Sequence, residues 1–233
     1  MKNIILAVLL GCLIYSCSDN SYLIDTGLHD TNYQGTVWDY LKEKKIDFDS
    51  LTKIIQLAGM QEVFEQDTIT FFAPSNPSIN SSVSDLNDYL YRRGQDTVKD
   101  LDQINPAVWK ELLSLYIIKD EYVLKDIPQL DTTQLDVFGG QTFLSYGGVP
   151  MNVGVVYFDA GGVKYAGYRQ LYYSYINDFS NEVGSLINVP VASSDIQPYN
   201  GAVHVLRYHN HEFGFISSDF INKVMAEGIE DAD

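Results

Sequence analysis

The feature that most constrains the fold is a change of hydrophobic pattern near Lys119. Before it, apolar residues recur at the three- and four-residue spacing of amphipathic helices, as in segments 50–59 and 106–116. After it, short apolar or alternating runs are separated by glycine pairs, which supply the positive dihedrals of tight hairpin turns. Helices followed by strands predict an α+β domain whose second half is antiparallel sheet.

One strand is predicted inside the helical half. Residues 67–76 contain a run of β-branched and aromatic residues that stops at Pro74, as in a buried strand. Asn76 before Pro77 then indicates a helix N-cap with proline at the first helical position. The same pair recurs at Asn105, before the helix that follows it. The sequence therefore predicts a strand that leads directly into a helix.

The N-terminal segment 1–16 has the pattern of a signal peptide: one lysine, a short apolar run and a small residue. The run is too short to span a bilayer as a helix. Ser16 before Cys17, with Ile14 three residues ahead of the cysteine, resembles a bacterial lipoprotein box and implies lipidation at Cys17. A rival box ends at Cys12, but it leaves a shorter apolar run.

A flexible tether is predicted over residues 17–34, because this stretch is polar and has no sustained apolar period. Its acidic start, residues 18–20, resembles the surface-export signals of Bacteroidetes-type lipoproteins. Leader and tether together imply a protein of the cell envelope, lipid-anchored to the outer membrane and facing outside.

Charge excludes one class of partner. The chain carries 15 Lys and Arg against 31 Asp and Glu, a net charge of -16 at pH 7. This average field repels polyanions, so nucleic acid is not expected as a partner. An apolar content of 45% in 233 residues is enough for one sizeable core.

Two segments resemble the paired boxes of the fasciclin (FAS1) family. Residues 70–76, Thr-Phe-Phe-Ala-Pro-Ser-Asn, are similar to the first box, and 194–206 to the second, of the type Asp-Ile-x-x-x-Asn-Gly-Val-Val-His-Val-Ile. The resemblance covers residues 35–208 and implies a fasciclin-like domain whose N-terminal helices pack on an antiparallel β-wedge or sandwich. The matching box residues are Thr70, Phe72, Ala73, Pro74, Asn76, Asp195, Asn200, Gly201 and His204.

Elementary chemistry predicts structural roles for these box residues. Pro74 can end a strand without a further ladder donor, and Asn76 can satisfy free helix amides. Asn200 and Gly201 can turn the chain into the apolar strand that follows. His204 lies within that strand, where a hydrogen-bonded core histidine is favoured over a ligand.

Tyrosines are the candidate binding residues. The family often carries a Tyr-His pair after its central helix, associated with adhesion, but here Tyr116 is followed by Ile117. Tyrosines also cluster in segment 165–175, where exposed rings could stack on sugars or on a partner protein. Cross-strand aromatic pairing would explain the same cluster without a ligand. The candidates are Tyr116, Tyr168, Tyr172 and Tyr173.

Catalytic machinery is not expected. The sequence has no Gly-x-Ser-x-Gly elbow, no phosphate-binding glycine loop and no cysteine beyond residue 17. His209 and His211 would share one face if they lay on a strand and could then hold a metal, although two solvated histidines explain them more simply. Beyond residue 208 we expect an extension, 209–233, with a helix over 218–228.

These features predict a non-enzymatic, lipid-anchored module of the cell surface that adheres to an extracellular protein or matrix component, with no cofactor, metal or catalytic residue. The first alternative is an accessory glycan-binding lipoprotein working beside an outer-membrane nutrient-uptake system. The second is a secreted hydrolase that uses carboxylates or the histidine pair.

Overall fold

In the computed structural model the described residues are 31–181, 183–209 and 211–230. The predicted leader, Cys12 and Cys17 lie outside them. The α-helices are α2 (Val37–Glu43), α3 (Lys45–Leu57), α4 (Gln61–Gln66), α5 (Asn76–Arg92), α6 (Pro106–Leu113) and α7 (Ser217–Glu227). The strands are β1 (Ile69–Ala73), β2 (Ile117–Lys119), β3 (Gln141–Leu144), β4 (Pro150–Tyr157), β5 (Arg169–Ile176), β6 (Leu186–Ile196) and β7 (Gly201–Leu206). Short 3-10 helices include η3 (Ser114–Tyr116) and η4 (Leu124–Asp126).

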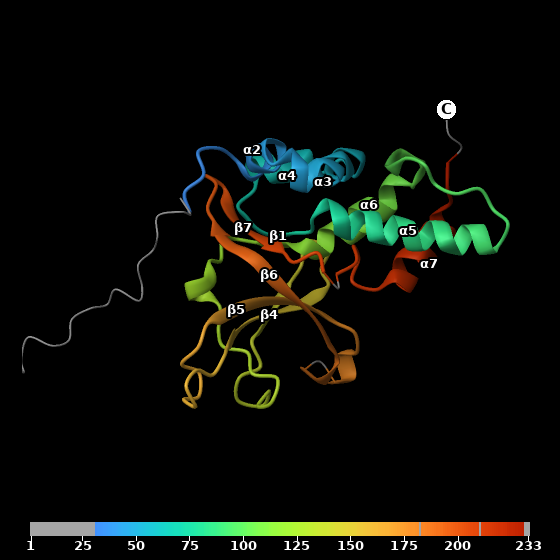
Figure 1. The fold of residues 1–233 in the computed structure, drawn as a ribbon. Coiled ribbons are helices and arrows are strands. Elements are labelled where there is room, and N and C mark those ends of the chain that lie inside the picture. The colour runs from blue at the N-terminus through green and yellow to red at the C-terminus, as the bar shows by residue number, and fades with distance from the viewer. Residues whose placement is uncertain (1–30, 182, 210, 231–233) are drawn as a thin grey trace, which may run out of the picture. The chain divides into compact units, whose positions relative to one another are not determined.

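The strands form one seven-stranded sheet in the order β2-β1-β7-β6-β5-β4-β3. The pairs from β3 to β7 are antiparallel, as the glycine-separated runs predict. The β1–β7 pair is parallel, so the sheet is mixed. Figure 1 shows the helices gathered at the β1 and β7 side of the sheet, with β4 and β5 extending away from them. The predicted α+β architecture, with N-terminal helices packed on the sheet, is confirmed.

The sheet curls until it is nearly closed. Phe72 of β1 and Tyr173 of β5 are fully buried, and their rings stack with centroids 3.9 Å apart and planes 4° from parallel. Two strands, β7 and β6, separate β1 from β5 in the sheet order. These two rings can meet only because the sheet bends around a shared interior. Aromatic stacking of this kind adds to the stabilisation from buried apolar area.

The structure corrects the predicted role of Asn76. Ser75, not Asn76, occupies the N-cap position of α5. The Asn76 side chain instead accepts a hydrogen bond from the Ser50 N–H (2.8 Å) and donates one to the Ile46 carbonyl (3.0 Å). These contacts lie on either side of a kink at Phe48, where two helical segments join within α3. The box asparagine therefore fixes the kink of another helix. Asn105 does cap α6, as predicted.

The C-terminal part belongs to the domain core. The predicted helix is present as α7. Phe220 of α7 and Phe213 are fully buried, and both rings lie within 6 Å of the Trp109 ring of α6. Residues 211–230 therefore complete the packing around α6 instead of extending beyond it.

The predicted tether meets the domain at its last residues. Tyr33 donates its backbone N–H to the Gln197 carbonyl (2.9 Å), and its hydroxyl donates to Glu43 (2.8 Å). The predicted boundary at residue 35 is therefore too late, since residues 31–34 already contact the domain. Residues 17–30 lie outside the described part of the chain.

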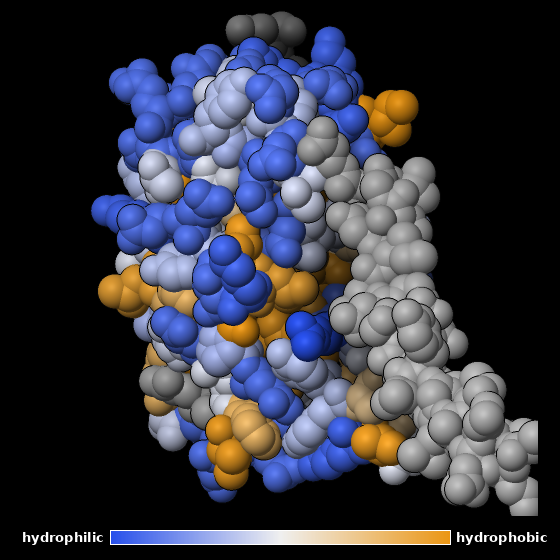
Figure 2. Space-filling model, turned by 90° about the vertical axis from the view of Figure 1, so that its left-hand side faces the viewer, coloured by the Kyte–Doolittle hydropathy of each residue, from blue (hydrophilic) through white to orange (hydrophobic). Residues whose placement is uncertain are grey.

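One face of the domain has both hydrophilic and hydrophobic areas. Figure 2 shows the side that lies on the left in Figure 1, where hydrophilic side chains surround a central hydrophobic area. No helix in the described part of the chain combines the length and apolar character needed to cross a bilayer.

Candidate functional site

Thr70 of the first box holds the segment that follows β2. Its hydroxyl donates to the Asp120 carbonyl (2.8 Å) and accepts from the Tyr122 N–H (2.7 Å). Asp120 adopts a positive φ of 71°, which is uncommon for a residue with a side chain. The two hydrogen bonds from Thr70 stabilise this turn, although some 50 residues of chain separate its ends from the threonine.

The second box fixes the same segment from the other side. The Asp195 N–H donates to His204 Nδ1 (3.2 Å), so Nε2 carries the proton and donates to the Tyr122 carbonyl (2.9 Å). Asp195 also accepts the Leu124 N–H (2.7 Å) through its carboxylate. Burial lowers the pKa of His204, against smaller raising effects of the Tyr122 carbonyl and the Asp195 charge. His204 is therefore a neutral core histidine, as the sequence predicts, and not an ion-pair partner of Asp195.

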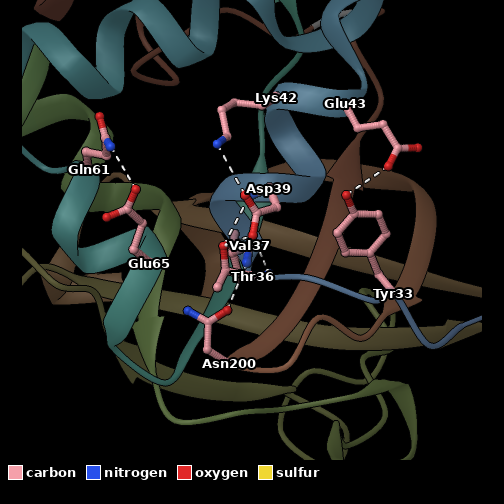
Figure 3. Close-up of polar contacts among 9 residues, drawn as sticks. All are labelled: Tyr33, Thr36, Val37, Asp39, Lys42, Glu43, Gln61, Glu65 and Asn200. Atoms are coloured by element: carbon pink, nitrogen blue, oxygen red, sulfur yellow. Dashed lines mark hydrogen bonds and ion pairs between the residues drawn. The ribbon is translucent and has the colours of Figure 1, made fainter.

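Asn200 links α2 and the end of α4 to the start of β7, and Figure 3 shows its contact with Val37 of α2. Its side-chain oxygen accepts the N–H of Val37, the first residue of α2 (2.8 Å). Its side-chain nitrogen donates to the carbonyls of Phe64 (3.2 Å) and Asp67 (2.9 Å), at the end of α4. Figure 3 also shows the capping box of α2, in which Thr36 and Asp39 exchange hydrogen bonds. Asn200 thus satisfies helix-end groups that have no partner within their own helices.

The box residues therefore stabilise the fold. Phe72 and Ala73 are fully buried in β1, and the polar box residues make their hydrogen bonds within the domain. What they hold in place is the surface segment 120–124 at the end of β2. The groups beside that segment are the candidates for contact with a partner.

A groove lies beside this segment, where the two end strands of the sheet approach each other. We call it the seam groove. Its volume is about 390 Å³. The strands are bridged between Ile118 and Ser145, and the Tyr146 N–H donates to the Ile117 carbonyl (2.7 Å). The groove is lined by Ile118, Lys119, Tyr122, Phe143, Leu144, Ser145, Tyr146 and Gly148.

The seam groove offers aromatic faces and one cation. The Tyr122 and Phe143 rings meet edge to face with centroids 4.8 Å apart. Lys119 Nζ lies 5.7 Å from the centroid of the Tyr146 ring, a cation–π contact. Leu144 is 64% exposed and adds an accessible apolar side chain beside these rings. The groove therefore suits apolar and aromatic contacts to a partner.

Of the four candidate tyrosines, Tyr116 and Tyr173 are not exposed, so the hypothesis that these rings form a binding surface fails for both. Tyr173 is fully buried and donates its hydroxyl to the Leu115 carbonyl, and Tyr116 is fully buried as well. Tyr172 lies on the opposite face of β5 from Tyr173, because neighbouring strand residues point to opposite faces. Tyr168 is 66% exposed and stacks on Phe158. These rings do not form one surface.

His209 and His211 do not share the face of a strand, because β7 ends at Leu206 and neither histidine lies on a strand. The favoured interpretation, two solvated histidines, is wrong for His211. His211 is buried, and its Nε2 lies 3.3 Å from the Tyr116 hydroxyl, which accepts the Gly214 N–H (2.8 Å). The fold thus brings a histidine to Tyr116 from a distant segment. No group of three or more His, Cys, Asp or Glu residues within the described ranges could hold a metal ion.

The groove residues escaped prediction from sequence. They come from segments 118–122 and 143–148, which are too short to show a periodicity of their own. The sequence did show two aromatic residues, Phe143 and Tyr146, close to the glycine pair at 147–148. It shows other glycine turns as well, and only the pairing of this turn with β2 distinguishes it from them.

Comparison with known proteins gives one family. The sequence model of the fasciclin domain family matches residues 46–208. Fifteen solved chains match. One of them, a FAS1 domain pair from the insect cell adhesion molecule Fasciclin I, shares 14% sequence identity with a TM-score of 0.47. The alignment covers 74% of this chain and 49% of that structure, so the chain spans about half its length. No curated protein matches the chain.

Proposed function

This chain belongs to the fasciclin domain family, whose model covers more than half of it, and on this premise we propose that it is a non-enzymatic cell-surface module that binds an extracellular partner protein. The observation that carries the proposal is the seam groove. Its aromatic side chains and exposed Leu144 form a surface of the kind found at the centre of protein interfaces.

The box hydrogen bonds support the same function. Thr70, Asp195 and His204 fix segment 120–124, which carries Tyr122 into the groove. A surface held rigid before binding loses less conformational entropy when a partner docks. The family's shared residues would therefore contribute to binding through preorganisation, without touching the partner.

The binding test uses the full chain and a panel of cells, extracellular matrix proteins and envelope proteins. We expect at least one partner to bind. Because truncation of a central aromatic contact commonly costs 1–2 kcal/mol or more, Tyr146→Ala should weaken this binding by about tenfold. Tyr91→Ala is the matched control, since Tyr91 is 78% exposed on α5 and does not line the groove. A uniformly negative panel, or equal losses in both variants, would contradict the proposal.

We propose in addition that the module is lipid-anchored through Cys17 at the outer membrane, facing outside. The support is the leader pattern and the lipoprotein-like box in the sequence. Metabolic labelling with a fatty-acid analogue should modify the wild type and Cys12→Ser, and labelling should be lost in Cys17→Ser. Labelling that persists in Cys17→Ser would move the anchor to Cys12 or elsewhere.

A further inference from the structure

Strand β3 has an open edge beside the seam groove. It is the last strand in the sheet order and pairs with β4 along one side. On the other side, within the described part of the chain, β2 meets this hairpin at the Ile118–Ser145 bridge and the adjacent Tyr146 hydrogen bond. The remainder of β3, residues 141–143, therefore has a strand neighbour on one side only.

The register shows which groups point to that edge. The Ser145 N–H donates to the Val149 carbonyl (2.8 Å), which makes Leu144 and Pro150 a non-hydrogen-bonded pair. Non-hydrogen-bonded and hydrogen-bonded pairs alternate along an antiparallel ladder. Thr142 and Asn152, two positions along from Leu144 and Pro150, are therefore also a non-hydrogen-bonded pair. The N–H and C=O of Thr142 therefore point away from β4. An edge of this type is a template on which an extended peptide can add as a further strand.

The side chains beside this edge favour a peptide with apolar side chains at every second residue. Phe143 and Leu144 border the groove from β3, and Tyr122 closes it from the segment after β2. A strand added at Thr142 would direct every second side chain toward one face of the sheet. Lys119 is the charged residue that lines the groove, and the exposed carboxylates of Asp120 and Glu121 follow it directly. Together with the net charge of -16, these carboxylates would attract a basic segment and repel an acidic one.

We propose that the seam groove binds an extended, basic segment of the partner protein, which adds to β3 through the backbone of Thr142 and places alternate apolar side chains against Tyr122 and Tyr146. This inference deepens the proposed function and rests on it, because it names the form and charge of the segment that the module recognises.

The test measures binding of a fluorescein-labelled octapeptide of alternating lysine and valine to the full chain. Thr142→Pro removes the N–H that points outward and leaves the ladder with β4 intact. It should weaken binding about tenfold or more, because a buried carbonyl of the peptide loses its donor. Thr142→Ala is the matched control, since it keeps that N–H; its affinity should stay within about twofold of wild type. Hydrogen exchange should show new protection in β3 when the peptide binds.

A second probe covers the case that Thr142→Pro does not fold. The same octapeptide, N-methylated at alternate residues, cannot pair with the edge and should bind the wild type about tenfold more weakly. The inference is overturned if the unmodified peptide does not bind, if Thr142→Pro or N-methylation has no effect, or if a glutamate–valine octapeptide binds as tightly.

The two proposals fail separately. A partner protein from the panel that binds wild type and Thr142→Pro equally would leave the proposed function standing and remove strand addition. An empty panel, with a peptide that still binds in a Thr142-dependent way, would remove the proposed function and keep the edge as a peptide site.

Discussion

Replacing Gly201 by alanine is expected to destabilise this protein severely. Gly201 has a φ of +145°, and a Cβ atom added there would lie 1.8 Å from the Ile69 carbonyl oxygen. Ile69 and Gly201 are the first pair of the parallel β1–β7 ladder, so relief of this clash must separate the two box strands. We expect a loss on the order of 4 kcal/mol, a large part of the roughly 5–15 kcal/mol by which domains are stable.

Gly94 provides the matched control for this prediction. It also has a positive φ, +69°, but no atom lies within 4 Å of the position that a Cβ would take. Gly94→Ala should therefore cost only the backbone strain, about 1 kcal/mol. Urea unfolding of both variants, followed by circular dichroism, measures the difference. Equal midpoints would show that the close approach at Gly201 does not constrain the fold.

Acidification is expected to destabilise the domain through His211. Burial lowers its pKa to about 3, whereas an unfolded histidine titrates near 6.5. Below about pH 6.5 the unfolded chain therefore binds a proton that the folded chain does not, so stability falls as pH falls. This contribution amounts to about 2 kcal/mol at pH 5 relative to pH 7, and the loss continues until pH approaches 3.

The variant His211→Phe isolates this effect from the titration of the many carboxylates. Its ring can remain against Tyr116 and Phe215, which both contact the imidazole. Between pH 7 and pH 5 the wild type should lose about 2 kcal/mol more free energy of unfolding than the variant. Urea unfolding at both pH values tests this prediction, and parallel losses in the two proteins would refute it. The lowered pKa of His204 also destabilises the fold at acidic pH, but this effect is the same in both proteins and cancels when they are compared.

Local patterns in the sequence predict the elements well. The helix over 106–116 is present as α6 followed by the turn η3, and the run before Pro74 is present as β1. Periodicity is sufficient here because each segment buries one face over several turns or residues. Periodicity does not show that β1 and β7 are neighbours; the structure does.

Side-chain partners depend on contacts that no local pattern contains. Asn76 has the spacing of an N-cap, yet its side chain bonds the backbone of α3, because that helix passes close enough to compete for it. Tyr172 and Tyr173 are adjacent in sequence, and only the layer that covers one face of β5 decides that Tyr173 is buried. Both errors arise from assigning a residue its partner before its neighbours in space are known.

The sequence by itself determined the order of helices and strands, the core position of His204 and the acidic surface, because periodicity, turn residues and charge act locally or as a sum over the chain. Only the tertiary structure decided that His211 meets Tyr116 and that the two end strands of the sheet form the seam groove. The physical reason is the curl of the sheet: it brings together segments that share no pattern, and the groove exists only where its two edges approach without fully pairing.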